Sequence, residues 1–108
     1  MKSKVVWSGQ VKGYVRAKAP EPRRELWRQI KRLADWNGRE RAPRIRHLED
    51  ELVGYWRLRV ERDRIIFREA FEEGQRVIKC LFAGPRLTVY EMFAELLLDE
   101  LSSKQVSS

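Results

Sequence analysis

Apolar and polar residues alternate along residues 54–67, the segment GYWRLRVERDRIIF. A period of two residues is typical of half-buried β-strands, so this segment predicts two strands joined by a tight turn. A third strand is expected to follow, because Glu72-Glu73-Gly74-Gln75 has the composition of a hairpin turn. We expect the three strands to cover about residues 53–60, 64–71 and 76–83.

Helical patterns precede these strands. KVVW, residues 4–7, predicts a short strand, and Ser8 is a favourable N-cap for a helix that we expect to end near residue 17. A second helix is expected to begin at the proline-containing segment after it. Its apolar residues recur at intervals of three and four, as on one helical face, and Asn37-Gly38 ends it.

The remaining segments complete the predicted fold. Residues 38–51 form a charged connection without a period, residues 89–101 predict an amphipathic closing helix, and residues 102–108 are expected to be a frayed tail. A chain of 108 residues can bury one core. We therefore expect a single α+β domain over residues 1–108, in the order β-α-α-β-β-β-α. In it, two N-terminal helices pack on an antiparallel four-stranded sheet, and a C-terminal helix closes the chain.

Arginines occupy one side of the central strands. Trp56 and Leu58 point to one face of a strand, whereas Arg57 and Arg59 point to the other. The register that joins the apolar residues of neighbouring strands also joins their cations. The cationic residues expected on one face of the sheet are Arg57, Arg59, Arg64, Arg68 and Lys79.

Like charges on neighbouring strands are destabilising, by roughly 0.2–1 kcal/mol per pair. One interpretation is that Glu61, Asp63, Glu69 or the acidic last helix pairs with these arginines. The other is a cleft that binds phosphate, which we favour because guanidinium groups match phosphate in bidentate geometry.

Net charge supports a polyanionic partner. The chain carries +7, and residues 1–50 hold 14 Lys and Arg against 6 Asp and Glu, which gives +8. The second predicted helix carries a basic stripe that is either a solvated face or a surface for an RNA backbone. Its members are Arg23, Arg24, Arg28, Lys31 and Arg32.

Other kinds of site are disfavoured by composition. One cysteine and one histidine provide neither an intrachain disulfide nor a zinc site of Cys and His, and we expect no metal or cofactor. The longest aliphatic run, Leu96-Leu97-Leu98, is too short for a membrane span, and the first residues lack the apolar stretch of a signal peptide. We therefore expect a cytoplasmic protein.

Two segments together resemble a known family. LVGYWRLRVERDRIIF, followed by GPRLTVY, resembles the RelE/ParE superfamily of toxins from type II toxin–antitoxin modules, and KVVWS and GYW are similar to its YoeB-like branch. The resemblance implies helices packed on an antiparallel sheet. It also implies an endoribonuclease that cuts mRNA in the ribosomal A site and is held inactive by a cognate antitoxin protein.

The resemblance also implies a catalytic set. The basic pair of the family falls on Arg57 and Arg59, the arginine that opens the next strand on Arg64, and the final pair on Arg86 and Tyr90. An arginine does not give up its proton, so these arginines would stabilise charge at phosphorus.

The general base remains open at this stage. Tyr90 is the first candidate for proton transfer, or for stacking on a nucleobase of the RNA. Alternatively, it is an ordinary amphipathic residue at the start of a helix. His47 is either the base or a surface residue, and Glu49 and Glu51 are weaker options.

Two alternative functions share these features. One is a gyrase inhibitor of the ParE kind, whose members generally lack the full basic and tyrosine set. The other is an RNA-binding module without catalysis.

Overall fold

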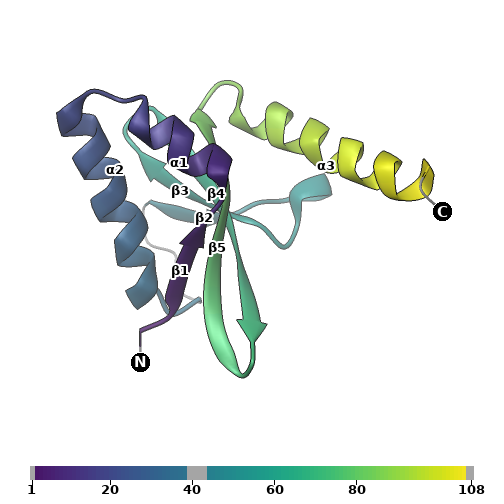
Figure 1. The fold of residues 1–108 in the computed structure, drawn as a ribbon, viewed down its shortest axis with the longest axis horizontal. Coiled ribbons are helices and arrows are strands. Elements are labelled where there is room, and N and C mark those ends of the chain that lie inside the picture. Colours follow the sequence, from purple (N-terminus) through teal and green to yellow (C-terminus); the bar gives the residue numbers. More distant parts are fainter. Residues whose placement is uncertain (1, 39–43, 107–108) are drawn as a thin grey trace.

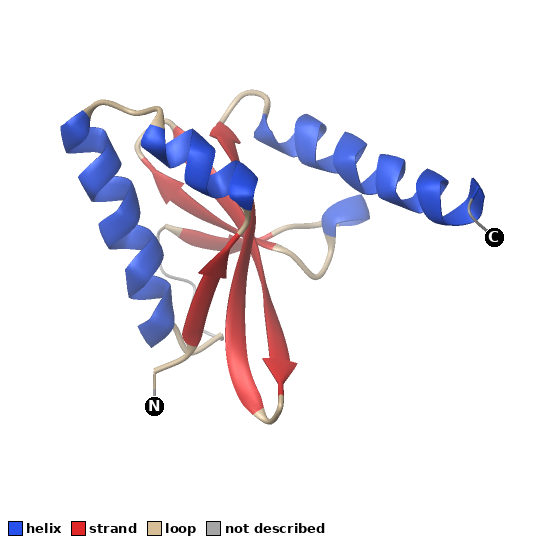
Figure 2. Cartoon of the chain, in the orientation of Figure 1, coloured by secondary structure: helices blue, strands red, loops and turns tan. Residues whose placement is uncertain are grey.

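The computed structural model describes residues 2–38 and 44–106, with side chains described as far as residue 101. Its elements follow the predicted order with one strand added (Figures 1 and 2). Within the described ranges no helix is long and apolar enough to cross a membrane. The elements are β1 (Lys4–Trp7), α1 (Gly9–Arg16), α2 (Pro20–Arg32), η1 (Leu33–Asp35), β2 (Ile45–His47), η2 (Asp50–Leu52), β3 (Trp56–Val60), β4 (Asp63–Glu72), β5 (Gln75–Pro85) and α3 (Val89–Val106).

The strands form one sheet in the order β1-β5-β4-β3-β2. β1 pairs parallel with β5, and the other neighbours are antiparallel. The predicted α+β fold is confirmed, but the sheet has five strands instead of four and one pair is parallel. The strand that the sequence did not reveal is β2, which is only 3 residues long and therefore too short to show an alternation.

Two predicted segments are only partly described. Residues 39–43 of the charged connection and residues 107–108 of the expected frayed tail lie outside the described residues. Residues 102–106 of that tail belong to α3.

Ser8 begins the first helix, as predicted. Its Oγ accepts a hydrogen bond from the Val11 amide at 3.2 Å and donates one to the Leu81 carbonyl at 2.9 Å. The side chain thus caps α1 and ties it to β5. In α2, Leu26 and Ile30 are buried on the predicted face.

Helices cover both faces of the sheet. α1 and α2 lie over one face, and the first turns of α3 pack against the other before the helix extends away from the sheet (Figure 1). The core under α1 and α2 contains Val11, Val15, Leu26, Ile30, Leu33, Trp36, Leu58, Val60, Ile65, Phe67, Ile78, Cys80 and Ala83. The core under α3 contains Leu52, Ile66, Phe82, Val89 and Phe93.

The predicted alternation in β3 and β4 holds over most of their length. Leu58 lies opposite Ile65, and Trp56 opposite Phe67, on the side of α1 and α2. Phe71 was expected in the same buried set, but it is 68% exposed. The end of the β4–β5 hairpin extends beyond the helices, so none of the described helices covers this position (Figure 1).

The two phenylalanines of β4 provide a matched test of this core. Phe67→Ala is expected to lower the free energy of unfolding by about 3–5 kcal/mol, because Phe67 is fully buried and its ring packs on Trp36. Phe71→Ala should change it by less than about 0.5 kcal/mol. Urea denaturation of both variants measures the difference, and equal losses would contradict the described core.

Candidate functional site

Arginines of three strands converge on the face opposite α1 and α2. Arg46 of β2 lies opposite Arg57 of β3, and Arg59 of β3 lies opposite Arg64 of β4. Directly opposed residues of antiparallel strands share a face, with Cβ atoms about 4.5–5.5 Å apart. The structure therefore brings together three arginines that the sequence predicted for this face, and it adds Arg46.

Two adjoining cavities occupy this end of the sheet. The first, of about 400 Å³, is lined by Arg46, Leu48, Arg57, Arg64, Arg86, Leu87 and Tyr90. The second, of about 310 Å³, shares Arg64 and Arg86 and adds Arg59, Glu25, Arg44, Val60 and Glu61. We call six of these lining residues the arginine groove: Arg46, Arg57, Arg59, Arg64, Arg86 and Tyr90. All five residues of the catalytic set implied by the resemblance belong to it.

Arg57 is one of two almost fully buried arginines in the groove, the other being Arg64. The Arg57 side chain is only 9% exposed, and its buried Nη1 has no hydrogen-bond partner among the described residues. Burial lowers the pKa of the Arg57 guanidinium, and the nearby Arg64, Arg46 and Arg59 lower it further, whereas Tyr90 acts in the opposite direction. A buried cation with an unsatisfied donor is unfavourable unless an anion reaches it.

Arg64 is held in place by the turn between β3 and β4. Its Nη1 donates hydrogen bonds to the carbonyls of Glu61 and Asp63, both at 2.9 Å. The Asp63 carboxylate in turn accepts a hydrogen bond from the Tyr14 hydroxyl and lies 2.8 Å from Lys18 Nζ. The turn is thereby tied to α1, and it holds the Arg64 guanidinium in a fixed position.

Arg86 and Tyr90 come from the connection between β5 and α3. The Arg86 amide donates to the Arg62 carbonyl at 2.9 Å, which fixes the connection to the β3–β4 turn. A Cβ at Gly84 would lie 3.3 Å from Val89 Cγ2, so the glycine lets α3 start close against β5. The next residue of α3 is Tyr90, which thus lines the groove.

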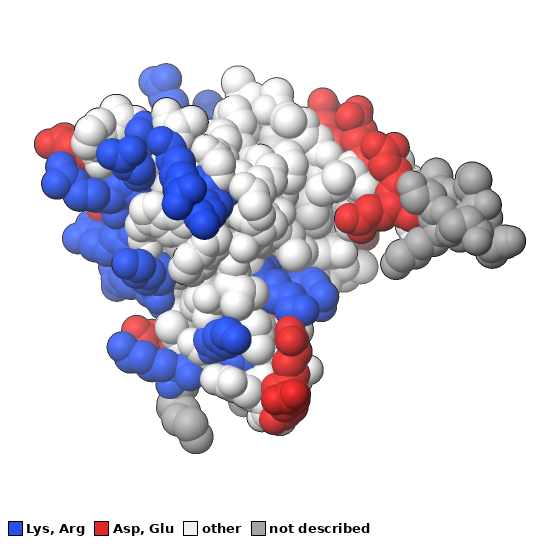
Figure 3. Space-filling model, in the orientation of Figure 1, with Lys and Arg blue, Asp and Glu red and all other residues white. Residues whose placement is uncertain are grey.

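The carboxylates of the described chain do not neutralise these arginines. None of the groove arginines forms an ion pair within the described residues. Asp63 pairs with Lys18, and Glu69 pairs with Arg76. Glu91 lies in the first turn of α3 and the other acidic residues lie farther along the helix, where Figure 3 shows an acidic patch. The interpretation in which the chain's own acids pair with the central arginines is therefore not supported.

Other predicted residues lie outside the groove. His47 faces the opposite side of the sheet, because it pairs with Trp56, and its Nε2 accepts the Gly54 amide at 3.2 Å. Arg68 and Lys79 share the face of the arginines but lie farther along the strands. Lys79 Nζ is 2.8 Å from Glu72, and Arg68 lines a separate cavity with Phe93.

The basic stripe lies on α2, apart from the groove arginines. Its members Arg23, Arg24, Arg28, Lys31 and Arg32 form part of the cationic side of the molecule (Figure 3). Arg28 is paired with Glu25 one turn before it.

The sequence did not reveal Arg46 as a groove residue. Arg46 lies opposite Arg57 on the neighbouring strand, and this position can be predicted only if β2 is recognised as a strand. No group of three or more His, Cys, Asp or Glu side chains suited to a metal ion occurs in the part of the chain that the structure describes.

Comparison with known proteins gives matches of structure only. Neither a family model nor a curated protein sequence matches the chain. Among solved structures, the RelE–RelB complex of Pyrococcus horikoshii contains a similar chain, with a TM-score of 0.60 and 21% identity over 80% of this chain and 97% of that one.

Two further solved structures are similar. The YoeB/ParE toxin of Agrobacterium tumefaciens has a TM-score of 0.59 and 15% identity over 77% of this chain and 98% of its own. A chain of the RelBE2 toxin–antitoxin complex of Mycobacterium tuberculosis has a TM-score of 0.56 and 16% identity over 80% and 100%. The protein thus has the fold of the RelE/ParE toxins, the fold that the resemblance in its sequence implied.

Proposed function

We propose that the protein is the toxin of a type II toxin–antitoxin module and that it cleaves mRNA in the ribosomal A site. The observation that carries the proposal is the buried Nη1 of Arg57, which has no hydrogen-bond partner among the described residues, in a groove whose arginines form no ion pair there. A scissile phosphate would supply the missing acceptor. The shared fold with RelE and YoeB/ParE proteins adds support.

The proposed reaction is an attack within the RNA strand. The ribose 2′-oxygen forms a bond to phosphorus while its proton passes to a base, and the bond from phosphorus to the 5′-oxygen breaks. The 5′-oxygen takes up a proton, which leaves a 2′,3′-cyclic phosphate and a 5′-hydroxyl. Negative charge grows on the phosphoryl oxygens during the attack, so fixed cations lower the barrier. The chain's own arginines supply these cations.

The groove residues divide into two roles. Arg57 and Arg64 are buried and the turn carbonyls fix Arg64, so these two arginines would hold the phosphate and stabilise the charge that develops on it. Arg59 and Arg86 are exposed at the rim and would contact the strand from outside. Tyr90 is the one side chain lining the larger cavity, within the described chain, that is suited to exchange a proton with the substrate, because the others are arginines and leucines.

The proposal includes a protein partner and a location. The RelBE2 structure is a toxin–antitoxin complex and the Pyrococcus horikoshii structure is a RelE–RelB complex, which supports a cognate antitoxin for this chain. Its substrate would be mRNA on ribosomes, and it would therefore act in the cytoplasm.

Toeprinting of an mRNA on purified ribosomes tests the proposed activity. We expect cuts in the A-site codon with the unaltered protein and a loss of roughly 10²–10³-fold in cleavage rate for Arg57→Gln, because one cation that holds the phosphate is removed. Arg16→Gln, at an exposed position of α1, is the matched control and should cleave normally. Absence of cuts combined with inhibition of DNA supercoiling by gyrase would instead indicate the ParE type of activity.

The role of Tyr90 is tested by removing its hydroxyl alone. Tyr90→Phe keeps the ring and should slow cleavage by roughly 10²–10⁴-fold if the hydroxyl transfers a proton. Single-turnover rates on programmed ribosomes measure the effect. A variant that cleaves at the normal rate would show that only the ring contributes.

Arg57 is expected to serve binding at the expense of stability. Arg57→Met should raise the free energy of unfolding by about 1 kcal/mol, because an unsatisfied buried cation is replaced by an apolar side chain of similar length. The same variant should fail to cleave mRNA. Urea denaturation provides the measurement, with Arg16→Met as the control, and a marked loss of stability would show that Arg57 supports the fold itself.

A further inference from the structure

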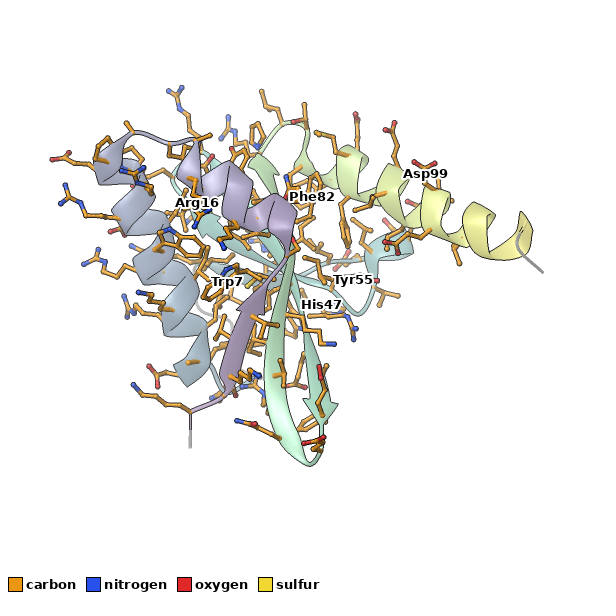
Figure 4. The ribbon with its side chains drawn as sticks, in the orientation of Figure 1. Trp7, Arg16, His47, Tyr55, Phe82 and Asp99 are labelled. Atoms are coloured by element: carbon orange, nitrogen blue, oxygen red, sulfur yellow. The ribbon has the colours of Figure 1, made fainter. Side chains whose placement is uncertain are left out.

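A second candidate surface lies where α2 meets the end of β1. Trp7 pairs in register with Cys80 and so faces the α2 side of the sheet, and Figure 4 shows it between α2 and β1. Its ring and that of Trp27 on α2 have centroids 5.0 Å apart and are inclined by 58°. Trp7 remains 40% exposed, although an indole of this size is usually more deeply buried.

Cations surround this pair of indoles. A cavity of about 560 Å³ is lined by Trp7, Arg24, Trp27, Arg28 and Lys31, which we call the tryptophan pocket. Arg28 is paired with Glu25, whereas Arg24 and Lys31 form no ion pair within the described residues. Within the described residues, no cation stacks on the indole of Trp7 or of Trp27. The pocket thus combines accessible aromatic surface with positive charge that the chain leaves largely uncompensated.

We propose that the tryptophan pocket binds an unpaired nucleotide of RNA, at a site separate from the arginine groove. A nucleobase would stack on the accessible indole of Trp7, and Arg24 and Lys31 would contact the flanking phosphates. Aromatic stacking beside a cationic surface is the general means by which proteins bind single strands without reading their sequence. None of the five pocket residues lines the groove.

Charge favours RNA over an acidic peptide as the occupant. The pocket lies within the part of the chain, residues 1–50, that carries the entire positive excess of the protein. Figure 3 shows cationic residues gathered over this side of the molecule, around α2. A phosphate chain uses both components of the pocket at once, since its charges repeat at each nucleotide and every base offers a flat face.

The test uses the full chain with its groove disabled, so that success or failure does not depend on the proposed nuclease activity. In the background Arg57→Gln/Arg86→Gln, binding of a short 2′-O-methyl oligonucleotide, which cannot be cleaved, is measured by fluorescence anisotropy. An abasic oligonucleotide of the same length serves as the second probe. Trp7→Leu removes stacking and keeps apolar bulk, Trp7→Phe restores an aromatic ring, and urea denaturation checks that each variant folds.

Stacking predicts a selective pattern. Trp7→Leu should weaken binding of the base-containing oligonucleotide about tenfold, Trp7→Phe should restore most of the affinity, and the abasic probe should respond to neither. Arg24→Gln/Lys31→Gln should weaken both probes and lower the slope of log Kd against log salt by roughly 1.4, at about 0.7 per cation. Lys12→Gln, at an exposed position of α1, should change the affinity for either probe much less.

Three results would overturn the proposal. One is equal binding of the base-containing and abasic probes, and another is equal affinity of Trp7→Leu and Trp7→Phe. The third is absence of RNA binding together with weakened binding of the cognate antitoxin by Trp7→Leu, which would assign the pocket to a protein partner.

Discussion

Repulsion among the guanidinium groups of the arginine groove is the constraint on which the rest of the site depends. Register places Arg46 against Arg57 and Arg59 against Arg64, and within the described chain no carboxylate pairs with any of them. Such an arrangement persists only because apolar cores on both faces of the sheet hold the strands in place. The same repulsion makes the groove unfavourable for further cations and favourable for an anion, which is the physical basis of the proposed binding of phosphate.

Strand alternation directs Asp63, the acidic residue next to Arg64 in the chain, away from the groove. Asp63 precedes Arg64, yet the two side chains point to opposite faces of the sheet. On its own face Asp63 is buried beside Tyr14 and Lys18. Burial, followed by the hydrogen bond to Asp63, raises the pKa of the Tyr14 phenol, and the hydrogen bond to Asp63 raises that of the Lys18 ammonium. One turn thus anchors itself to α1 through its acid and presents its arginine to the groove, so acid and arginine do not neutralise each other.

The sequence alone predicted the parts of this arrangement that follow from local periodicity. Alternation along residues 54–67 assigned Arg57, Arg59 and Arg64 to one face, and the resemblance in sequence supplied Arg86 and Tyr90. The alternation of side chains along a strand predicts the face on which a residue lies but does not show where along the strand a cavity begins or ends. Arg68 therefore lies on the predicted face but outside the groove. The sequence likewise did not show on which face of the sheet His47 lies, because this depends on the pairing between β2 and β3. The same pairing places Arg46 in the arginine groove.

The position of Tyr90 depends on an irregularity that no local pattern shows. In a regular hairpin that starts from the Glu72–Gln75 pair, each step back along β4 is matched by one step forward along β5. Here the register shifts between Ile66 and Phe67, so that Phe67 pairs with Cys80 and Ile66 with Phe82. Leu81 therefore has no paired residue on β4. Ser8 binds the carbonyl of Leu81, so a residue far away in sequence stabilises this bulge.

The shift has a direct consequence for the groove. Because of it, Gly84 and not Ala83 lies opposite Arg64, and a methyl group at that position would press on Val89, where α3 begins. Without the bulge, Ala83 would face α3 and Gly84 would leave a gap in the core under α1 and α2. The bulge therefore brings the tyrosine of α3 to the arginines of β3 and β4, and it couples the capping of the first helix to the geometry of the site.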